Sequence, residues 1–434
     1  MAVPCRSERP VDPDSAALAS LESARSLAAD VVVVGAGPVG LLTAYRLQSL
    51  GLSCLVVDKR TAPSKASRAS TFQPACLDRL AELGLLAALL PQGRQVSLLR
   101  HLALPSGERR DWSLACLQGQ TQHPFRLHLE QHLLCELLLQ RLTRRQAPGQ
   151  PPVLWGQALV GLGRNPAPDQ PGRLEAWVQR SDAGARPQRL TARWLVAADG
   201  AHSTVRQLLQ LPFDGHDLPA PVVRVMLAQL PAAVGAELAG LTYLRHPLGS
   251  LSALQMRTDW RLILRPGAAE LDSALADDRW ARERLGQLFS SVCEPSVWQD
   301  LPMVHDHYRV GQRCVGVRQV GRCLLVGDAA HITNTRGGLN MNFGLLEGLD
   351  LADSLASASN QSAAQQQLAV ANWASHWQER TTSVLLARTA RLLDSNPAFE
   401  PNLGNRSPER DATVLIKACL LDLTISRNNR NHAR

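Results

Sequence analysis

The chain has 434 residues, of which 45% are hydrophobic and 19% charged. This balance is typical of a globular protein, and the length is enough for two or more domains. The formal net charge of +8 indicates a solvated basic surface or, alternatively, attraction of anions such as cofactor phosphates or an acidic substrate. Because the arginines are scattered and aromatic residues make up only 4%, nucleic acid is not an expected partner.

The N-terminal segment and the cysteines bear on location. Residues 1–29 carry charges throughout and lack the apolar core of a signal peptide, so we expect an N-terminal extension with a short helix from Ser15 to Ala29. No apolar run reaches the roughly 18 residues that a membrane span needs. The nine cysteines form no CxxC pair and no cluster with zinc spacing. Reduced thiols in a cytoplasmic protein are the simplest interpretation.

The first elements form a strand, helix and strand in sequence. The β-branched run Val31–Val34 predicts a strand buried on both faces. A helix is expected from Pro38, where the missing N–H costs nothing, to Gly51. A second strand follows over Leu52–Val57 and is closed by Asp58. This order predicts a parallel sheet with a crossover helix.

Periodicity and turn signals predict the later elements. Gly161-Leu162-Gly163 is expected to be a turn, because no helix and no third glycine follow it. The remaining elements expected, in chain order, are a helix over 75–90, a mixed region over 94–124, a helix over 129–145, strands over 153–163, 173–179 and 189–197, an antiparallel sheet over 211–309, a buried strand over Cys323–Val326, and helices over 342–357 and 363–393.

The turn after the first strand reads Gly35-Ala36-Gly37-Pro38-Val39-Gly40 and matches GxGxxG. In this pattern Gly35 permits the tight turn, Gly37 lets the backbone approach a pyrophosphate, and Gly40 allows close packing of helix on strand. Asp58, with Lys59 after it, ends the second strand, where a carboxylate can accept hydrogen bonds from ribose hydroxyls. The motif in this context predicts dinucleotide binding.

Two further motifs follow predicted strands. Asp199-Gly200-Ala201-His202-Ser203-Thr204-Val205-Arg206 comes after the strand that ends near residue 198, and Gly327-Asp328-Ala329-Ala330-His331 comes after Val326. Taken alone, Asp199 reads as a turn former and Arg206 as a surface helix residue. Asp328 can accept from a ribityl hydroxyl or cap the next helix.

The three motifs, in this order, resemble those of the FAD-dependent aromatic hydroxylases, the single-component flavoprotein monooxygenases, over about residues 30–355. The resemblance implies that Asp328 binds the ribityl chain of FAD and that Asp199 and Gly200 lie near its pyrophosphate and contribute to NAD(P)H binding. It also implies contacts of Gln131 and Arg68 with the cofactor, for which a solvated helix-start glutamine and a surface arginine are the alternatives.

The segment after Asp328 departs from the family pattern. Asn334 and Thr335 replace prolines, Asn340 replaces a glycine, and Glu347-Gly348 replaces an Asp-Ala pair. The family residues kept are Gly337, Gly338 and Asn342. They are expected to lead into a helix N-terminus near flavin N1 and O2, where its positive end stabilises the anionic reduced flavin.

The implied activity is hydroxylation of an aromatic or similarly electron-rich small molecule with NAD(P)H and O2, through a flavin C4a-hydroperoxide. Because the flavin carries the chemistry, no catalytic base is nominated. Tyr243, His246 and Arg224 fall in the expected pocket sheet, with structural roles as the alternative. His305 and His307 would share a strand face, but no further ligand is evident, so no metal site is predicted.

Other functions stay open at this point. The lost prolines favour an FAD-dependent oxidase, dehydrogenase or reductase on the same fold, without oxygen insertion. A degenerate flavin-binding assembly partner is a third reading, and a halogenase is disfavoured because no WxWxIP segment is present. The oligomeric state is open between a monomer and a homodimer.

The predicted fold class is α/β: a Rossmann-type FAD-binding domain with an inserted, mainly antiparallel β-sheet substrate domain and C-terminal helices. The predicted parts are an extension over 1–29, a discontinuous FAD-binding domain over 30–93, 125–210 and 310–355, a substrate-binding sheet domain over 94–124 and 211–309, and a C-terminal helical region over 356–434.

Overall fold

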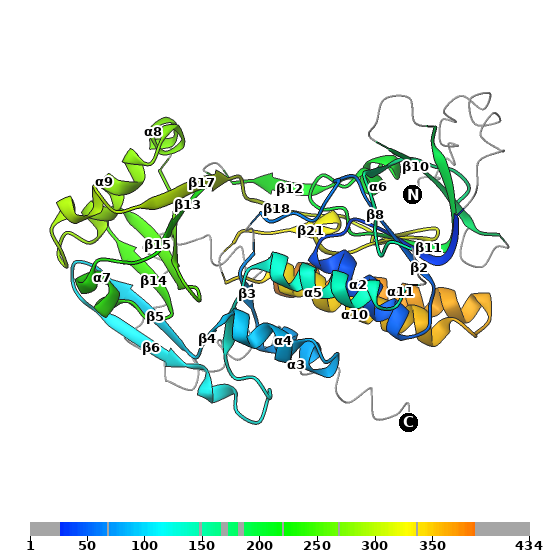
Figure 1. Ribbon diagram of the computed structural model, residues 1–434, viewed down its shortest axis with the longest axis horizontal. Helices are drawn as coiled ribbons and strands as arrows, with labels where there is room; N and C mark the ends of the chain where they lie inside the picture. Colours follow the sequence, from blue (N-terminus) through cyan, green and yellow to red (C-terminus); the bar gives the residue numbers. More distant parts are fainter. Residues whose placement is uncertain are drawn as a thin grey trace, which may run out of the picture.

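The computed structural model describes residues 27–386 except 67–68, 147–149, 166–171, 181–185, 219–220, 268–269 and 336. Arg68, most of the expected N-terminal extension and the expected helix beyond residue 386 therefore lie outside the described residues. Two large sheets occupy opposite ends of the molecule, and smaller sheets lie between them (Figure 1). No helix in the described part of the chain is long and apolar enough to cross a membrane.

The first large sheet has eight strands, with the path β19-β20-β11-β1-β2-β8 and with β10 and β9 continuing from β11. The strands from β20 to β8 run parallel, whereas β19 and β10 pair antiparallel with their neighbours. Their bounds are β1 (Leu27–Val34), β2 (Cys54–Asp58), β8 (Leu154–Trp155), β9 (Gln157–Leu162), β10 (Leu174–Arg180), β11 (Gln188–Ala197), β19 (Gln319–Val320) and β20 (Cys323–Leu325).

The β1 strand is buried on both faces, as its β-branched run predicts. Val31 and Val33 join the hydrophobic core on one side of the sheet, and Val32 and Val34 join the core on the other. The strand starts earlier than expected, because Leu27–Ala29 pair with Leu190–Ala192 of β11. The helix expected up to Ala29 is therefore wrong for these three residues, whose backbone hydrogen bonds go to the sheet.

Helices α2, α5, α10 and α11 form a layer that supplies about half of the first core (Figure 1). The longest of them, α10, starts at Asn340 and packs along α2. The bounds are α2 (Pro38–Ser49), α5 (Gln131–Thr143), α10 (Asn340–Ala358) and α11 (Ala363–Arg380), the last followed by the π-helical segment η6 (Thr381–Leu386).

Two sequence predictions need correction. The single helix expected over 75–90 is divided into α3 (Pro74–Glu82) and α4 (Leu86–Leu89), with η1 (Leu90–Gln92) after it. The break is a Schellman motif: Gly84 has φ +68°, and the Leu85 N–H donates to the Leu80 carbonyl at 2.9 Å. The expected turn at Gly161 is strand β9, where Gly161 pairs with Trp177 beside a register shift.

The second large sheet has seven strands in the order β17-β13-β16-β15-β14-β5-β6. All neighbours pair antiparallel except β14 and β5, which run parallel. Helices on one face close a core of their own (Figure 1). The bounds are β5 (Leu98–Ala103), β6 (Arg109–Ser113), β13 (Val222–Leu227), β14 (Leu241–His246), β15 (Gly249–Gln255), β16 (Trp260–Leu264), β17 (Met303–Tyr308), α7 (Ala232–Glu237), α8 (Leu271–Ala276) and α9 (Arg279–Leu288).

Two three-stranded sheets, in the orders β12-β18-β21 and β3-β7-β4, lie between the large ones. Short helical turns complete the described elements. The bounds are β3 (Thr71–Phe72), β4 (Arg94–Val96), β7 (Arg126–His128), β12 (Asp214–Asp217), β18 (Gly311–Cys314), β21 (His331–Ile332), α6 (Thr204–Leu208), η2 (Leu114–Leu117), η4 (Pro295–Trp298) and η5 (Gly327–Ala329).

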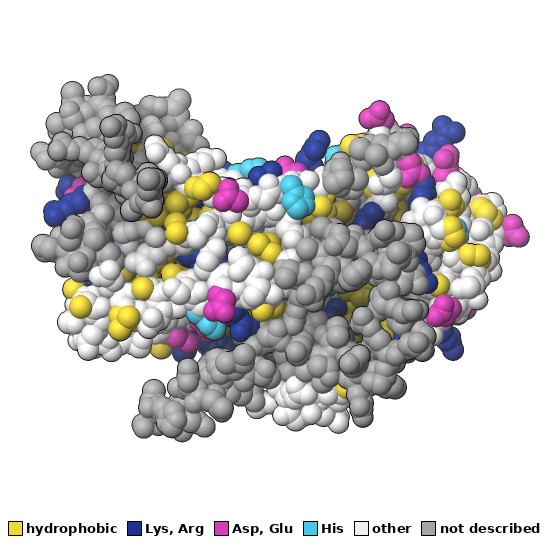
Figure 2. All heavy atoms as spheres, turned by 180° about the vertical axis from the view of Figure 1, so that it is seen from behind, with side chains coloured by type: hydrophobic (Ala, Val, Ile, Leu, Met, Phe, Trp, Pro, Cys, Tyr) yellow, Lys and Arg dark blue, Asp and Glu magenta, His cyan; other side chains and the backbone are white. Residues whose placement is uncertain are grey.

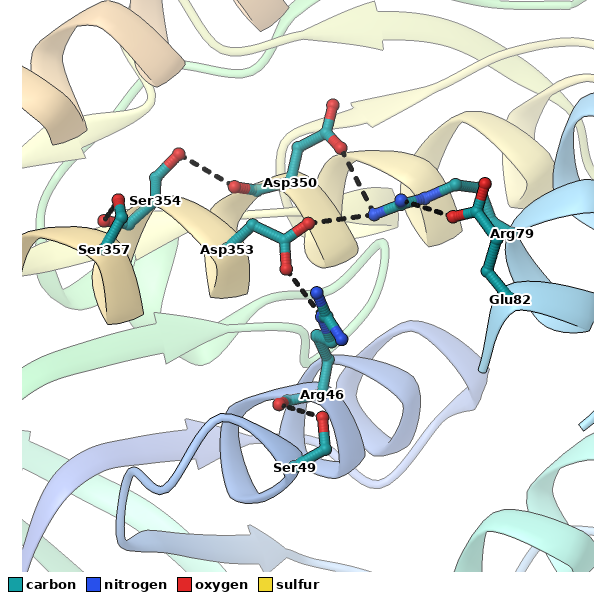
Figure 3. A network of polar contacts seen from close by, with 8 residues as sticks. All are labelled: Arg46, Ser49, Arg79, Glu82, Asp350, Asp353, Ser354 and Ser357. Atoms are coloured by element: carbon teal, nitrogen blue, oxygen red, sulfur yellow. Dashed lines mark hydrogen bonds and ion pairs between the residues drawn. The ribbon is translucent and has the colours of Figure 1, made fainter. Parts of the chain in front are cut away.

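An ion-pair network fixes α10 against α2 and α3 (Figure 3). The Asp353 carboxylate of α10 accepts from Arg46 of α2 at 2.5 Å and from Arg79 of α3 at 2.9 Å. Arg79 also lies 3.8 Å from Asp350, one turn away on α10. Shared carboxylates couple charges into a network, which is worth more than isolated surface pairs. The network therefore sets the relation of three helices.

Candidate cofactor and substrate site

The three motifs meet at one edge of the parallel sheet, although they are spread over about 300 residues of sequence. The Gly-rich turn follows β1, the Asp199 segment follows β11, and the Asp328 segment follows β20, three adjacent parallel strands. A Cβ added to Gly35 would lie 2.3 Å from the Ala198 carbonyl oxygen. One added to Gly327 would lie 3.1 Å from the Val39 side chain. The carboxyl edge of such a sheet is where α/β proteins bind dinucleotides.

The three glycines of the turn have the surroundings that dinucleotide binding requires. Gly35 has φ +104°, and a Cβ on Gly40 would lie 2.0 Å from the Gly35 carbonyl oxygen, so both are needed for the turn and its packing. A Cβ on Gly37 would meet no atom within 4 Å. Gly37 is the N-cap of α2 and Pro38 follows at its first position, with no side chain capping the helix. The helix N-terminus thus faces open space that suits a pyrophosphate.

Asp58 ends β2 at the same edge. Its carboxylate accepts from the Ala36 N–H at 2.7 Å and from the Arg60 guanidinium at 2.9 and 2.7 Å. Burial raises the pKa of Asp58, but the hydrogen bonds from Arg60 and Ala36 outweigh it, so the net pKa is lowered and the group is ionised at neutral pH. An ionised acceptor here fits a ribose hydroxyl, whereas Lys59 is exposed beside it.

The Asp199 segment is tied to its own helix and to the Asp328 segment. Asp199 accepts from the Val205 N–H at 3.1 Å at the start of α6, and burial raises the pKa of its carboxyl. Gly200 has φ +87° and faces open space, since an added Cβ would meet nothing within 4 Å. Arg206 is buried, donates to the Ala329 carbonyl at 2.9 Å and lies over the Phe213 ring. The alternative prediction that Arg206 is a surface helix residue is wrong, because its buried side chain joins the Asp199 segment to the Asp328 segment.

The side-chain amides of Asn342 and Gln73 hold the glycine turn, Gly337-Gly338, which precedes α10. Asn342 is fully buried and accepts from the Gln73 N–H at 2.8 Å while donating to the Thr71 and Gly338 carbonyls. The Gln73 side chain donates to the Gly337 carbonyl at 2.7 Å. Both glycines have positive φ, +83° and +61°. Asn342 thus shapes the turn through the glycine backbone.

Gln131 and Asp328 each form a side-chain hydrogen bond with another segment. Gln131 starts α5, where its side-chain oxygen accepts from the Ala69 N–H at 3.4 Å and its own N–H donates to the Ala69 carbonyl. Asp328 lies in η5, and its carboxylate accepts from the Asn340 side-chain amide at 2.8 Å. The Asn340 that replaces a family glycine thus contacts the acid assigned to the ribityl chain.

One face of the seven-stranded sheet contacts these loops. Arg224, Arg261 and Tyr308 share this face, because Arg224 pairs across the strands with Ile263 and Asp306. The Tyr308 hydroxyl interacts with the Thr335 side chain, just before the glycine turn. Arg261 forms an ion pair with Glu130, directly before α5. The face therefore contacts Thr335, before the glycine turn, and Glu130, before α5.

The charges on this face are paired. Arg224 forms a bidentate ion pair with Asp306. Burial lowers the pKa of Arg261 to about 10, which leaves the group charged at neutral pH. Burial likewise raises the pKa of the Tyr308 hydroxyl and keeps it protonated. The face therefore presents buried cations and a hydroxyl donor.

Tyr243 and His246 lie elsewhere on the sheet. Both belong to β14, which is four strand spacings from β17, roughly 19 Å. Tyr243 lines a hollow of about 70 Å³ with His101 and Arg110, at the β5–β6 end. Of the three pocket candidates from the sequence, only Arg224 lies near Tyr308. Among the residues that the structure describes, no group of His, Cys, Asp and Glu could hold a metal ion.

Comparison with known proteins identifies the family. The family model described as "FAD binding domain" matches residues 28–377. The chain is 31% identical over 339 residues to para-nitrophenol 4-monooxygenase of Pseudomonas sp. strain WBC-3, covering 75% of this chain and 77% of that protein. The chain belongs to the FAD-dependent aromatic hydroxylase family. The predicted family and FAD as cofactor are confirmed, and the protein is an FAD-dependent monooxygenase.

Further relatives of this hydroxylase agree. It is 31% identical over 332 residues to 6-methylpretetramide 4-monooxygenase of Streptomyces rimosus, covering 75% of this chain and 55% of that protein. The crystal structure of p-nitrophenol 4-monooxygenase from Pseudomonas putida DLL-E4 superposes with a TM-score of 0.71 at 24% identity, covering 93% of this chain and 97% of that one. This likeness confirms the predicted fold class.

Several residues beside the candidate site are not predicted by the sequence motifs. Tyr308 gave no signal, because its partner Thr335 lies in a loop of another sheet. Glu347 appeared only as a departure from the family pattern, and the fully buried Arg318 that pairs with it was not noticed. A buried charge in the apolar stretch after Asn342 was the available signal for Glu347, since such charges need a partner.

Proposed function

We propose that this monooxygenase hydroxylates a small phenolic compound with NAD(P)H and O2. Two observations support the proposal. The curated relatives that it matches include a para-nitrophenol 4-monooxygenase. The face of the seven-stranded sheet that meets the glycine turn carries Arg224, Arg261 and Tyr308, whose charges and hydroxyl suit an aromatic ring that bears an ionisable oxygen.

The chain offers a distinct group for each part of FAD. We assign the pyrophosphate to Gly37 and the N-terminus of α2, with Gly200 beside it, and the adenosine ribose to Asp58. We assign the ribityl chain to Asp328 and the flavin ring to Gly337 and Gly338. Bound FAD supplies the redox chemistry, which is hydride transfer from NAD(P)H followed by activation of O2 at flavin C4a. No side chain is needed as nucleophile.

The glycine turn would stabilise charge on the flavin ring. Gly337 and Gly338 precede α10, a helix of 19 residues whose N-cap, Leu339, provides no side-chain cap. The backbone N–H groups and the positive end of such a helix favour negative charge at the flavin N1 and O2 edge. Asn342 and Gln73 hold the turn in place, so the donors need no rearrangement during reduction.

The sheet face would orient the substrate and keep water out. A buried arginine next to a phenolic oxygen favours the phenolate, which is the more electron-rich ring. The Arg224–Asp306 and Arg261–Glu130 pairs hold both guanidiniums in place before substrate arrives. The contact of Tyr308 with Thr335 carries the proposal furthest, because it brings the substrate sheet to the turn assigned to the flavin.

The test combines cofactor consumption with labelled oxygen. FAD-loaded enzyme is mixed with a panel of phenols and with NADH or NADPH, and the product masses are measured after turnover under labelled O2. We expect a substrate that stimulates NAD(P)H oxidation and gains one labelled oxygen atom. An Arg224→Gln variant should raise the KM for phenolates more than it lowers the rate of flavin reduction.

A second function is favoured by Asn334 and Thr335, which stand where the family has prolines. If NAD(P)H oxidation yields only hydrogen peroxide or a dehydrogenated product, with no label incorporated, the oxidase or reductase reading replaces hydroxylation. Restoring both prolines should change the ratio of hydroxylated product to hydrogen peroxide.

A further inference from the structure

A continuous chain of buried polar side chains leads from Asp328 into the interior. The Asp328 carboxylate accepts from the Asn340 side-chain nitrogen at 2.8 Å, and the Asn340 oxygen lies 2.9 Å from His331 Nδ1. His331 Nε2 lies 3.2 Å from Glu347 Oε2. The other oxygen of Glu347 forms an ion pair with Arg318. The proposed flavin chemistry does not use His331, Glu347 or Arg318.

The inner part of this chain is shielded from solvent. The side chains of His331, Glu347 and Arg318 are all 0% exposed. Glu347 Oε2 also accepts from the Gly327 N–H at 2.7 Å, the residue directly before Asp328. A buried carboxylate with an arginine, an imidazole and a backbone donor around it fixes the geometry of its neighbours strongly. Glu347 therefore holds the turn that carries Asp328 in two ways.

The hydrogen-bond directions determine where protons must be. Asn340 donates its amide hydrogen to the Asp328 carboxylate, so its oxygen faces His331 and can only accept. His331 Nδ1 must then carry a hydrogen. Its Nε2 faces a carboxylate oxygen, so a hydrogen bond between His331 and Glu347 requires one further proton. Whichever of the two atoms carries it, the proton belongs to the pair.

From this geometry we propose that His331 and Glu347 are positioning residues for Asp328. They share one proton, which keeps the Asn340 amide directed at the Asp328 carboxylate and so holds that carboxylate ready for a ribityl hydroxyl of FAD. This inference rests on the assignment of Asp328 to the ribityl chain. The Asp328 carboxylate can accept hydrogen bonds from both the Asn340 amide and a ribityl hydroxyl.

Loss of the shared proton would reverse the directions of the hydrogen bonds from His331 through Asn340 to Asp328. The neutral imidazole then keeps a single hydrogen, and a hydrogen bond to the Glu347 carboxylate requires that hydrogen on Nε2. Nδ1 would be left without a hydrogen facing the Asn340 oxygen, acceptor against acceptor, and the amide would have to rotate. Rotation would turn the carbonyl of Asn340 toward Asp328, which disfavours the ionised carboxylate that FAD needs. FAD binding is thereby coupled to retention of one proton, and its affinity falls as the pH rises through the titration of the pair.

The groups around His331 and Glu347 have opposing effects on the position of the shared proton. Burial and the Arg318 guanidinium lower the pKa of His331 to about 3, which moves the shared proton toward Glu347. Arg318 favours the ionised form of Glu347, which moves it back. Asp328 of η5 lies beyond Asn340, the Phe343 ring of α10 stands edge-on to His331, and Cys314 of β18 acts on Arg318.

The decisive experiment is the pH dependence of FAD affinity. The dissociation constant is measured by flavin fluorescence between pH 6 and 9 for the wild type, Asn340→Gly and Glu347→Gln, with the melting temperature of each apo protein. For the wild type we expect affinity to fall by up to tenfold per pH unit in the upper part of the range.

The two variants should remove this dependence by different routes. Asn340→Gly removes the link to Asp328 and leaves the Arg318–Glu347 pair intact. It should bind FAD more weakly at pH 6, with little change across the range. Glu347→Gln can donate to His331 Nε2 without a titratable proton, so its affinity should also be flat. If Glu347→Gln does not fold, because Arg318 loses its counter-charge, Asn340→Gly decides the question alone.

Asp328→Asn separates this inference from the assignment beneath it. If Asp328→Asn weakens FAD binding while Asn340→Gly follows the wild-type pH profile, the positioning role is wrong and the ribityl assignment stands. If Asp328→Asn binds FAD like the wild type, the ribityl assignment fails and the positioning role falls with it. A wild-type affinity that is flat from pH 6 to 9 also overturns the proposal.

Discussion

Gly37 and Gly40 lie three residues apart and face opposite surroundings. A Cβ on Gly37 would enter open space, whereas one on Gly40 would collide with the Gly35 carbonyl oxygen at 2.0 Å. The backbone at Gly37, with φ −79°, is one that any residue adopts. The two roles that the motif predicts are thus separate, since of these two glycines only Gly40 is required by the protein's own packing. The absence of a side chain at Gly37 serves the ligand.

We therefore expect Gly37→Val to lose FAD affinity and keep its fold. The side chain would fill the approach of the pyrophosphate and displace at least one charge-assisted hydrogen bond, roughly 1.5–3 kcal/mol, or about 10- to 100-fold in the dissociation constant. Gly40→Val is the matched control and should lower the apo stability by about 1–3 kcal/mol or more. Flavin fluorescence and apo melting temperatures check both. A Gly37→Val protein with wild-type FAD content would contradict the assignment.

At the scale of elements, the close contact of α2 with α10 depends on small residues. A Cβ on Gly348 would lie 2.2 Å from Thr43 Oγ1, and one on Gly344 would lie 2.9 Å from the Gly327 Cα. The glycine found where the family has an alanine thus has a physical reason, because Thr43 faces it across the interface. This contact also presses α10 against the segment that carries Asp328.

Gly348→Ala should destabilise the wild type and stabilise a Thr43→Ala background. In the wild type the added methyl group collides with Thr43, at a cost of about 1–3 kcal/mol. In the Thr43→Ala background the added methyl group meets its remaining neighbours at ordinary van der Waals distances. Alanine then gains roughly 0.5–1 kcal/mol over glycine within a helix. Urea unfolding of the four proteins measures the reversal. An effect of the same sign in both backgrounds would mean that Thr43 is not the obstacle.

At the scale of the whole molecule, two polar contacts join the seven-stranded sheet to the segment around β7. His128 of β7 donates from Nδ1 to the Gln255 carbonyl of β15 at 2.9 Å, and Arg261 pairs with Glu130 two residues further along. Burial lowers the pKa of His128 to about 4. The imidazole is thus neutral in the folded protein at neutral pH. On the face that Figure 2 shows, basic and acidic side chains intermingle among the described residues.

His128 should make the fold sensitive to acid. Its pKa is about 4 when folded and about 6.5 when unfolded, so the unfolded state binds more protons between these values. Stability is present above pH 6.5 and is lost as the pH falls toward 4, by up to about 3 kcal/mol. His128→Gln keeps a donor for Gln255 without titrating. Urea unfolding at pH 7 and 4.5 should show a smaller acid loss in this variant, and an equal loss would contradict the role.

The sequence predicted those parts of the site that lie within one continuous segment. The Gly-rich turn, Asp58 and the strand ends at Asp199 and Asp328 were placed by local pattern, because a parallel strand followed by a helix has a short-range signature. Contacts between segments were not predictable in this way. The Tyr308–Thr335 interaction joins a sheet strand to the segment before the glycine turn, and the Glu347–Arg318 pair joins α10 to a loop before β19. Gly84 is a signal for a helix end, but the helical spacing of the leucines on both sides of it predicts one continuous helix.

The order of strands in the eight-stranded sheet also determines when the protein can fold during synthesis. Val31 pairs with Trp194, and Leu195 pairs with Cys323, so the sheet is completed only when the segment near residue 325 has been made. Until then the last residues of β11 have an unpaired apolar edge, and such edges associate with other chains. Large loops must also close before these contacts form, which slows folding. We expect nascent chains that end between residues 200 and 320 to depend on chaperones and to aggregate without them.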